Sequence, residues 1–156
     1  YPNACDQHVP AEVRACFADG KVPIIVGHLG NYENADGFVA MYTQAACHDY
    51  VREAHHGTNG EIDIIDDTHA KGLWGLGWRC VNTKDKTLTL VSLIYHDEYV
   101  KVNGAWKISA TRSEFKSAFH ASYEGEAMTA LVAGLTVADP PLRKHKAAES
   151  INLRKA

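Results

Sequence analysis

Alternating apolar and polar positions indicate that the middle of the chain forms a β-sheet. The alternation covers four segments, residues 61–65, 70–80, 86–102 and 105–115, and short polar stretches separate them. The last two segments meet at Asn103-Gly104, the dipeptide most typical of a two-residue hairpin turn. We therefore predict four strands that follow one another as an antiparallel meander.

The first third of the chain has helical spacing instead. Residues 8–20 predict a short helix with a proline in its first turn and a glycine at its end. A second helix is predicted after a polar loop, with Asn34 or Asp36 as its N-cap and apolar residues three and four positions apart. Between the two helices, the apolar run 22–28 predicts a buried strand.

Helices followed by a long antiparallel sheet indicate the α+β class. A chain of 156 residues suits one such domain, and its glycines at positions 72, 75 and 77 allow the sheet to bend. We predict that residues 1–125 form this domain. Residues 126–156 are predicted to form a C-terminal extension with a short helix, a Pro-Pro break and a basic tail.

Charge and composition narrow the choice of partners. The formal net charge of -3 predicts no basic face for a nucleic-acid backbone, so we expect no nucleic acid as partner. There is no run of about 18 apolar residues, and the first residues lack the pattern of a signal peptide. We therefore expect no membrane partner and a cytoplasmic location. The four scattered cysteines favour free thiols in a reducing compartment.

His55 and His56 are the first candidates for proton transfer. Adjacent residues of a strand point to opposite faces, so only one of them can serve a pocket. Histidine exchanges protons near neutral pH and works best beside a carboxylate that fixes its tautomer. Asp6 is such a carboxylate, or an ordinary residue at a helix start. A metal site would need a third ligand, and neither Asp49 nor Glu53 stands out, so we expect no metal and no cofactor.

Large side chains gather on one face of the strand at 70–80. Trp74, Leu76 and Trp78 alternate with smaller residues, which is typical either of a core face or of a ligand wall. On the next strand, His96 and Asp97 are expected on the solvent side. From the residues alone, neither reading of the bulky face is excluded.

Several motifs together resemble the SnoaL-like branch of the nuclear transport factor 2-like superfamily. They are the aspartate of ACDQ, then FADG, GNYENADGF, HHGTN, KGLW and YHDEYVKVNGAWKIS, in this order over residues 1 to about 115. The resemblance implies a cone-shaped α+β barrel, in which N-terminal helices and a curved antiparallel sheet enclose an apolar pocket. Part of the family's first helix is expected to precede Tyr1.

Within this branch, the sequence is most similar to eliminating enzymes: bile acid 7α-dehydratase, hexachlorocyclohexane dehydrochlorinase and, more distantly, scytalone dehydratase. Their aspartate and histidine fall on Asp6 and His55, which implies that His55 is the base and that Asp6 orients it. A tyrosine of the bile acid enzyme falls on Tyr1, which implies a hydrogen-bond donor to the substrate, although packing also suits this residue. The residues predicted to bind the substrate are Trp74, Leu76, Trp78, Val91, Tyr95 and Thr111.

The resemblance implies a cofactor-independent lyase that acts on a hydrophobic, cyclic, steroid- or polyketide-like molecule. Two alternatives remain open: a ketosteroid-type isomerase or polyketide cyclase, and a non-catalytic module for small-molecule binding or assembly. A second pocket carboxylate of the bile acid enzyme is replaced by Trp78, and a second tyrosine by Ile25, so we expect a more apolar pocket. Relatives associate through the outer sheet face, so a homo-oligomer is expected, as a trimer before a dimer.

Overall fold

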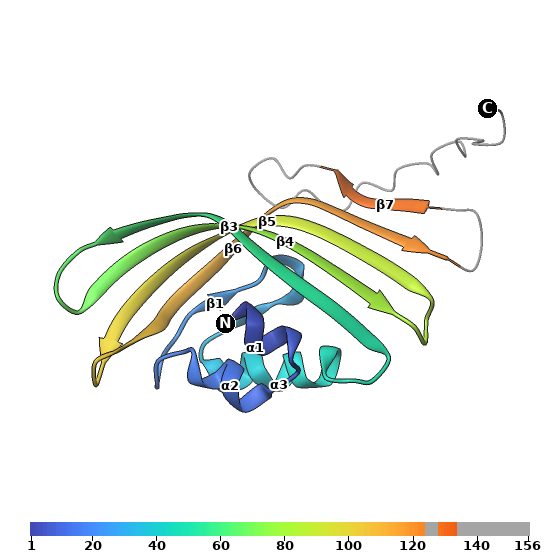
Figure 1. Ribbon diagram of the computed structural model, residues 1–156. Helices are drawn as coiled ribbons and strands as arrows, with labels where there is room; N and C mark the ends of the chain where they lie inside the picture. Colours follow the sequence, from blue (N-terminus) through green and yellow to red (C-terminus); the bar gives the residue numbers. More distant parts are fainter. Residues whose placement is uncertain (124–127, 134–156) are drawn as a thin grey trace.

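The described residues form a strongly curved sheet of seven strands that arches over three α-helices (Figure 1). The computed structural model describes residues 1–123 and 128–133. The helices are α1 (Pro2–Asp6), α2 (Pro10–Ala15) and α3 (Ala35–Ala46), and a 3-10 turn, η1, covers Gly27–Leu29. The strands are β1 (Ile24–Ile25), β2 (Asn31–Tyr32), β3 (Val51–Ile64), β4 (His69–Asn82), β5 (Thr87–Val102), β6 (Ala105–Ser122) and β7 (Met128–Ala133).

The four long strands form the predicted antiparallel meander. The strand order is β2-β1-β6-β5-β4-β3, and β7 pairs with β6. Asn103 and Gly104 both have left-handed backbone conformations, with φ of 51° and 81°, as a two-residue turn between twisted strands requires. The α+β prediction and the cone-like arrangement are confirmed. The sheet is open rather than closed, and it is mixed because β1 runs parallel to β6.

Three predicted segments have different boundaries or structures. β3 begins at Val51 rather than at residue 61. Its polar first half lacks the apolar-polar alternation of the predicted strands, and it is a strand because it pairs in register with β4. In the predicted strand 22–28, only Ile24–Ile25 is a strand, and η1 follows it. Met128–Ala133 is a strand rather than part of a helix. The predicted Pro-Pro break and basic tail lie outside the described residues.

The helices follow their sequence signals closely. α2 begins at Pro10, as expected for a residue that suits the first turn. α3 has Asn34 as its N-cap, and the Asn34 side chain accepts a hydrogen bond of 2.9 Å from the Gly37 N–H. Arg14 of α2 then donates to Asp36 of α3, with 2.6 Å between its Nε and the carboxylate. The Arg14–Asp36 ion pair therefore links α2 to α3 at the surface below the sheet.

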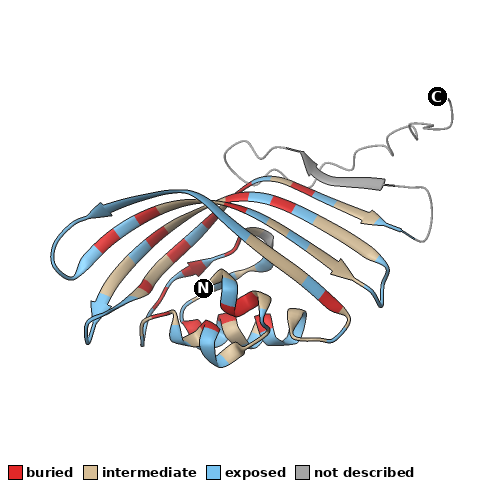
Figure 2. Ribbon diagram, viewed as in Figure 1, coloured by how far each residue is buried: buried red, intermediate tan, exposed pale blue. Residues whose placement is uncertain are grey.

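Two apolar clusters fill the space between the helices and the sheet. The first joins the helices to β1 and β6 around Val13, Val22, Ile24 and Phe38. The second lies on the sheet itself around Leu76, Leu93 and Phe115. Buried residues are accordingly found on the inner side of the helices and along the middle of the strands (Figure 2). We call the side of the sheet that covers the helices the concave face.

Candidate active site

Asp6 and His55 are in direct contact on the concave face, although 49 positions separate them. The Nδ1 atom of His55 lies 2.7 Å from Oδ1 of Asp6. The backbone N–H of His55 also donates to both carboxylate oxygens, at 3.1 Å each. One contact with the ring and two with the backbone therefore hold the carboxylate of Asp6 against His55, which leaves the Nε2 atom of the ring for other partners.

Local structure explains why these two residues meet. Asp6 is the last residue of α1, a helix that has Pro2 in its first turn. β3 is the final strand in the sheet order and pairs only with β4 among the described strands. An edge strand has backbone N–H groups without a ladder partner, and Asp6 accepts from one of them. His55 is the fifth residue of β3, so its backbone N–H lies near the start of this edge strand.

The Asp6–His55 pair is largely buried, but both side chains still reach solvent. The side chain of His55 is 11% exposed and that of Asp6 is 27% exposed. The His55 ring lies beside Trp78, its cross-strand neighbour on β4, with 6.1 Å between ring centroids. His56 follows His55 on the same strand and therefore points to the opposite face of the sheet.

Tyr1 packs into an aromatic group above the helices. Its ring lies 5.5 Å from Phe17 and 6.2 Å from Tyr95, measured between centroids, with edge-on geometry in both cases. Burial raises the pKa of the Tyr1 hydroxyl well above its ordinary value, and Tyr95 adds to the effect. Burial likewise raises the pKa of Tyr95. Both groups therefore stay protonated and can donate hydrogen bonds at neutral pH.

The residues predicted to bind the substrate share the concave face. Cross-strand pairing places Trp78 opposite Val91 and Trp74 opposite Tyr95. Leu76 and Val91 are buried in the sheet cluster, with Trp78 and Tyr95 packed against it. Their common face agrees with the alternation in the sequence, whereas their role in binding remains a prediction.

A buried carboxylate on β5 was not expected from the sequence. Asp97 was predicted on the solvent side, but it is 9% exposed and accepts hydrogen bonds at both oxygens. The Thr111 hydroxyl donates to Oδ1 at 2.6 Å, and the Tyr99 hydroxyl donates to Oδ2 at 2.8 Å. Trp74 in turn donates its indole N–H to the Tyr99 oxygen at 2.9 Å. Burial raises the pKa of Asp97, and the two hydroxyl donors oppose this shift.

Alternation with Tyr95 was the signal that could have revealed Asp97. Residues 95, 97 and 99 share one face of β5, so an aromatic residue on each side of Asp97 indicates the interior. Trp78 of β4 is apolar as expected, but the neighbouring strand β5 places the carboxylate of Asp97 on the same face. The correction concerns Asp97 alone, which lies inside the protein and not on the solvent side.

Glu53 is a second buried carboxylate that sequence reasoning did not single out. Its side chain is 4% exposed, and Oε2 accepts a hydrogen bond of 3.0 Å from the indole N–H of Trp78. Burial raises the pKa of Glu53, while His55 and Trp78 oppose the shift. Its two-residue spacing from His55 was the available sequence signal, because both side chains must then share a face of β3.

The convex side of the sheet has a different character. A groove of about 400 Å³ there is lined by charged and apolar residues together, and the charged ones include Glu61, Lys71, Glu98 and Arg112. Within residues 1–123 and 128–133, no three His, Cys, Asp or Glu side chains gather as metal ligands would. The same part of the chain has no helix long and apolar enough to cross a membrane.

Comparisons with known proteins agree with the fold. A putative scytalone dehydratase from Novosphingobium aromaticivorans has a TM-score of 0.69 at 21% identity, over 76% of this chain and 78% of that chain. The type 3 hexachlorocyclohexane dehydrochlorinase LinA from Novosphingobium barchaimii has a TM-score of 0.62 at 16% identity, over 89% and 87% of the two chains. No curated protein matches the sequence.

The match to a family of domains is more direct than these structural likenesses. It covers residues 1–112, which include α1 with Asp6, all of β3, β4 and β5, and the first part of β6. This range holds both members of the Asp6–His55 contact and the aromatic residues around it. The chain belongs to the SnoaL-like domain family.

Proposed function

We propose that the protein is a cofactor-independent lyase that uses the Asp6–His55 pair to remove a proton and a leaving group from neighbouring carbons. The substrate is a hydrophobic, cyclic, steroid- or polyketide-like small molecule. The observation that carries this proposal is the 2.7 Å contact between Asp6 and Nδ1 of His55 on the concave face. The fold shared with a dehydrochlorinase and a putative dehydratase is consistent with it.

Each residue of the pair has a defined role in this reaction. Asp6 accepts a hydrogen bond from the Nδ1–H group, so the lone pair of the neutral ring is on Nε2. Nε2 removes a proton from carbon, the electrons of that C–H bond form the new double bond, and the leaving group departs with its own bonding electrons. The imidazolium that forms is stabilised by the adjacent carboxylate of Asp6. Positioned bases of this kind contribute about 10² to 10⁴-fold.

Tyr1 assists the departing group. Its hydroxyl stays protonated because burial raises its pKa, so it can donate a hydrogen bond to a leaving oxygen or to a carbonyl that gains charge. The side chains that surround the substrate and exclude water are those of Trp74, Leu76, Trp78, Val91, Tyr95 and Thr111. Apolar contact contributes about 25 cal/mol per Å² of buried surface.

The neighbouring histidines provide a matched test of the base. A panel of hydrophobic cyclic β-hydroxy ketones and cyclic halides would be incubated with the protein, and loss of water or halide would be measured. His55→Ala should lower turnover by about 10² to 10⁴-fold, as loss of a general base does. His56→Ala removes an imidazole from the opposite face and should leave turnover unchanged. Near-normal turnover by the first variant would refute the role of His55.

The same experiment in heavy water separates elimination from related reactions. Isomerisation and polyketide ring closure also begin with proton abstraction, but they pass through an enolate that can take deuterium from the solvent, whereas a concerted elimination leaves the removed proton on His55. Loss of water or halide occurs only in elimination. Deuterium exchange without loss would favour the isomerase or cyclase, and neither exchange nor loss across the panel would favour a binding module.

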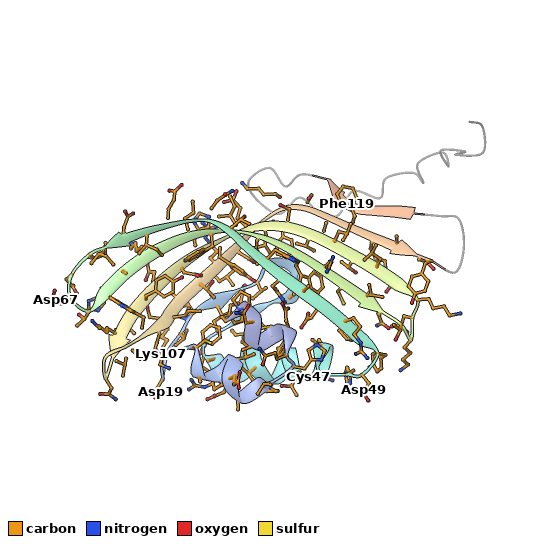
Figure 3. The ribbon with its side chains drawn as sticks, in the orientation of Figure 1. Asp19, Cys47, Asp49, Asp67, Lys107 and Phe119 are labelled. Carbon is orange, nitrogen blue, oxygen red and sulfur yellow. The ribbon has the colours of Figure 1, made fainter. Side chains whose placement is uncertain are left out.

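We also propose a homo-oligomer, a trimer before a dimer, formed through the convex face. This face exposes large apolar side chains, among them Leu90 and Phe119, which are each 41% exposed. Phe119 stands on the side of the sheet away from the helices (Figure 3). Sedimentation equilibrium would give the mass, and a monomer at micromolar concentration would contradict the proposal.

A further inference from the structure

Two short motifs of identical pattern face each other at the candidate site. Asp6-Gln7-His8 ends α1 and enters the following loop, and Glu53-Ala54-His55 lies within β3. Each motif has an acid and a histidine two residues apart. Asp6 contacts His55, and Glu53 lies 3.7 Å from Nε2 of His8, so the two contacts cross between the same two segments.

The second contact differs from the first because it is incomplete. Oε1 of Glu53 and Nε2 of His8 are both buried, and neither has a hydrogen-bond partner. His8 is also held in a left-handed backbone conformation with φ of 55°, which is uncommon for a residue with a side chain. Buried polar atoms without partners and strained backbone are both unfavourable, and they tend to be retained where they serve a site.

The other oxygen of Glu53 is fully engaged. Oε2 accepts from the indole N–H of Trp78 at 3.0 Å, and Trp78 is the residue directly across from His55 in the β3–β4 register. The carboxyl group of Glu53 therefore contacts two side chains next to the Asp6–His55 pair. One is the indole of Trp78, beside the His55 ring, and the other is the imidazole of His8, two residues after Asp6. The side chain of Glu53 is 4% exposed, so it lies almost wholly inside the protein.

We propose that Glu53 is a positioning residue for the Asp6–His55 pair, acting through Trp78 on one side and through His8 on the other. The indole fixed by Glu53 limits the rotation of the His55 ring, and the contact with His8 keeps the end of α1 against β3. Asp6 is two residues before His8, so the same contact keeps its carboxylate within reach of Nδ1. This role rests on the proposed function, in which His55 is the base.

The test uses the 156-residue chain labelled with ¹⁵N, and it follows two resonances, the Trp78 indole N–H and the His55 Nδ1–H. Glu53→Leu removes the acceptor, so the Trp78 signal should move upfield and the His55 signal should shift or broaden. Glu53→Gln should retain both signals, because its amide oxygen accepts from Trp78 and its NH₂ group can donate to neutral His8. Glu61→Leu makes the same change on the exposed side of β3 and should alter neither signal.

Turnover gives a second and independent readout. Glu53→Leu should lower kcat by about 10²-fold with little change in KM, as small displacements of a catalytic group do. Glu53→Gln should restore kcat to near the wild-type value. If the wild-type protein performs no elimination, the proposed function fails, whereas the two resonances still decide whether Glu53 positions the pair.

Two results would overturn the positioning role. One is a Glu53→Leu variant with both resonances at their wild-type positions. If that variant does not fold, Trp78→Phe removes the indole donor and keeps the carboxyl group, and the His55 signal should still be displaced. The other contradicting result is therefore an unchanged His55 signal in Trp78→Phe.

Discussion

Asp6 and Asp97 both accept hydrogen bonds on the concave face, but their donors belong to different chemical classes. Asp6 contacts an imidazole, whose Nδ1 lies 2.7 Å away, and remains 27% exposed. Asp97 is 9% exposed, and its two donors are the neutral hydroxyls of Thr111 and Tyr99. The partner of Asp6 is an imidazole, the side-chain type most often used for proton transfer, whereas the partners of Asp97 are hydroxyl groups.

The contrast separates a pair suited to proton transfer from a network suited to holding aromatic side chains. The Tyr99 hydroxyl donates to Asp97 and accepts from the indole N–H of Trp74. Through Tyr99, the buried carboxylate therefore orients Trp74, a residue of the predicted substrate wall. A network of this kind stabilises the fold when complete and is costly when one member is removed. The comparison therefore predicts that changes at Asp97 affect mainly stability and that changes at Asp6 affect mainly turnover.

Removal of each carboxylate should give the largest difference. Asp97→Ala leaves the hydroxyls of Thr111 and Tyr99 buried without an acceptor, so the free energy of unfolding should fall by about 3 to 5 kcal/mol. Asp6→Ala affects a partly exposed contact and should cost about 1 kcal/mol. Urea denaturation of both variants measures the difference. Equal losses would remove the distinction between the two sites.

A smaller effect is expected in the pH dependence of stability. Burial raises the pKa of Asp97 above its unfolded value of about 3.9, so the folded state holds this proton more tightly. The resulting stabilisation is complete below about pH 4 and is lost as the pH rises through the raised pKa.

Asp97→Asn has no proton to lose at this position. Between about pH 4 and pH 7, the unfolding free energy of the wild type should therefore decline relative to that of this variant. Chemical denaturation at several pH values gives both curves. Parallel curves would show that the carboxyl group of Asp97 titrates as it does in the unfolded chain.

The smallest change tests the far end of the same network. A Cβ atom on Gly60 would lie 2.3 Å from the Trp74 indole, so Gly60→Ala must displace the ring and should cost about 1 to 3 kcal/mol. A Cβ on Gly57, in the same strand, meets no atom within 4 Å. Gly57→Ala is the control and should leave the unfolding temperature nearly unchanged. Equal shifts for the two variants would contradict the close packing of Trp74.

Local signals in the sequence were sufficient for much of this fold. The Asn103-Gly104 turn, the Asn34 cap and the alternation of β4 and β5 each depend on neighbouring residues, and the structure confirms them. The first half of β3 could not be predicted in this way. It is polar and contains glycine, and pairing with β4 makes it a strand.

The candidate site also depends on contacts that neighbouring residues in the sequence do not predict. Similarity to the family selected Asp6 and His55, because no local pattern connects residues 49 positions apart. Asp97 was misplaced because a charged residue next to a histidine was assigned to solvent, while its buried partners lie on β5 and β6. The contact between Glu53 and His8 likewise depends on how α1 meets β3. Tertiary packing, rather than residue type, decides which carboxylates are buried.

The tautomer of His55 tests the central claim most directly, and it requires no substrate. The ¹⁵N shifts of the imidazole nitrogens distinguish a ring protonated on Nδ1 from one protonated on Nε2. If Asp6 prepares His55 as a base, the neutral ring carries its proton on Nδ1 in the wild type, and Asp6→Asn shifts population toward the Nε2–H form. A wild-type ring protonated on Nε2, or a tautomer unaffected by Asp6→Asn, would contradict the account.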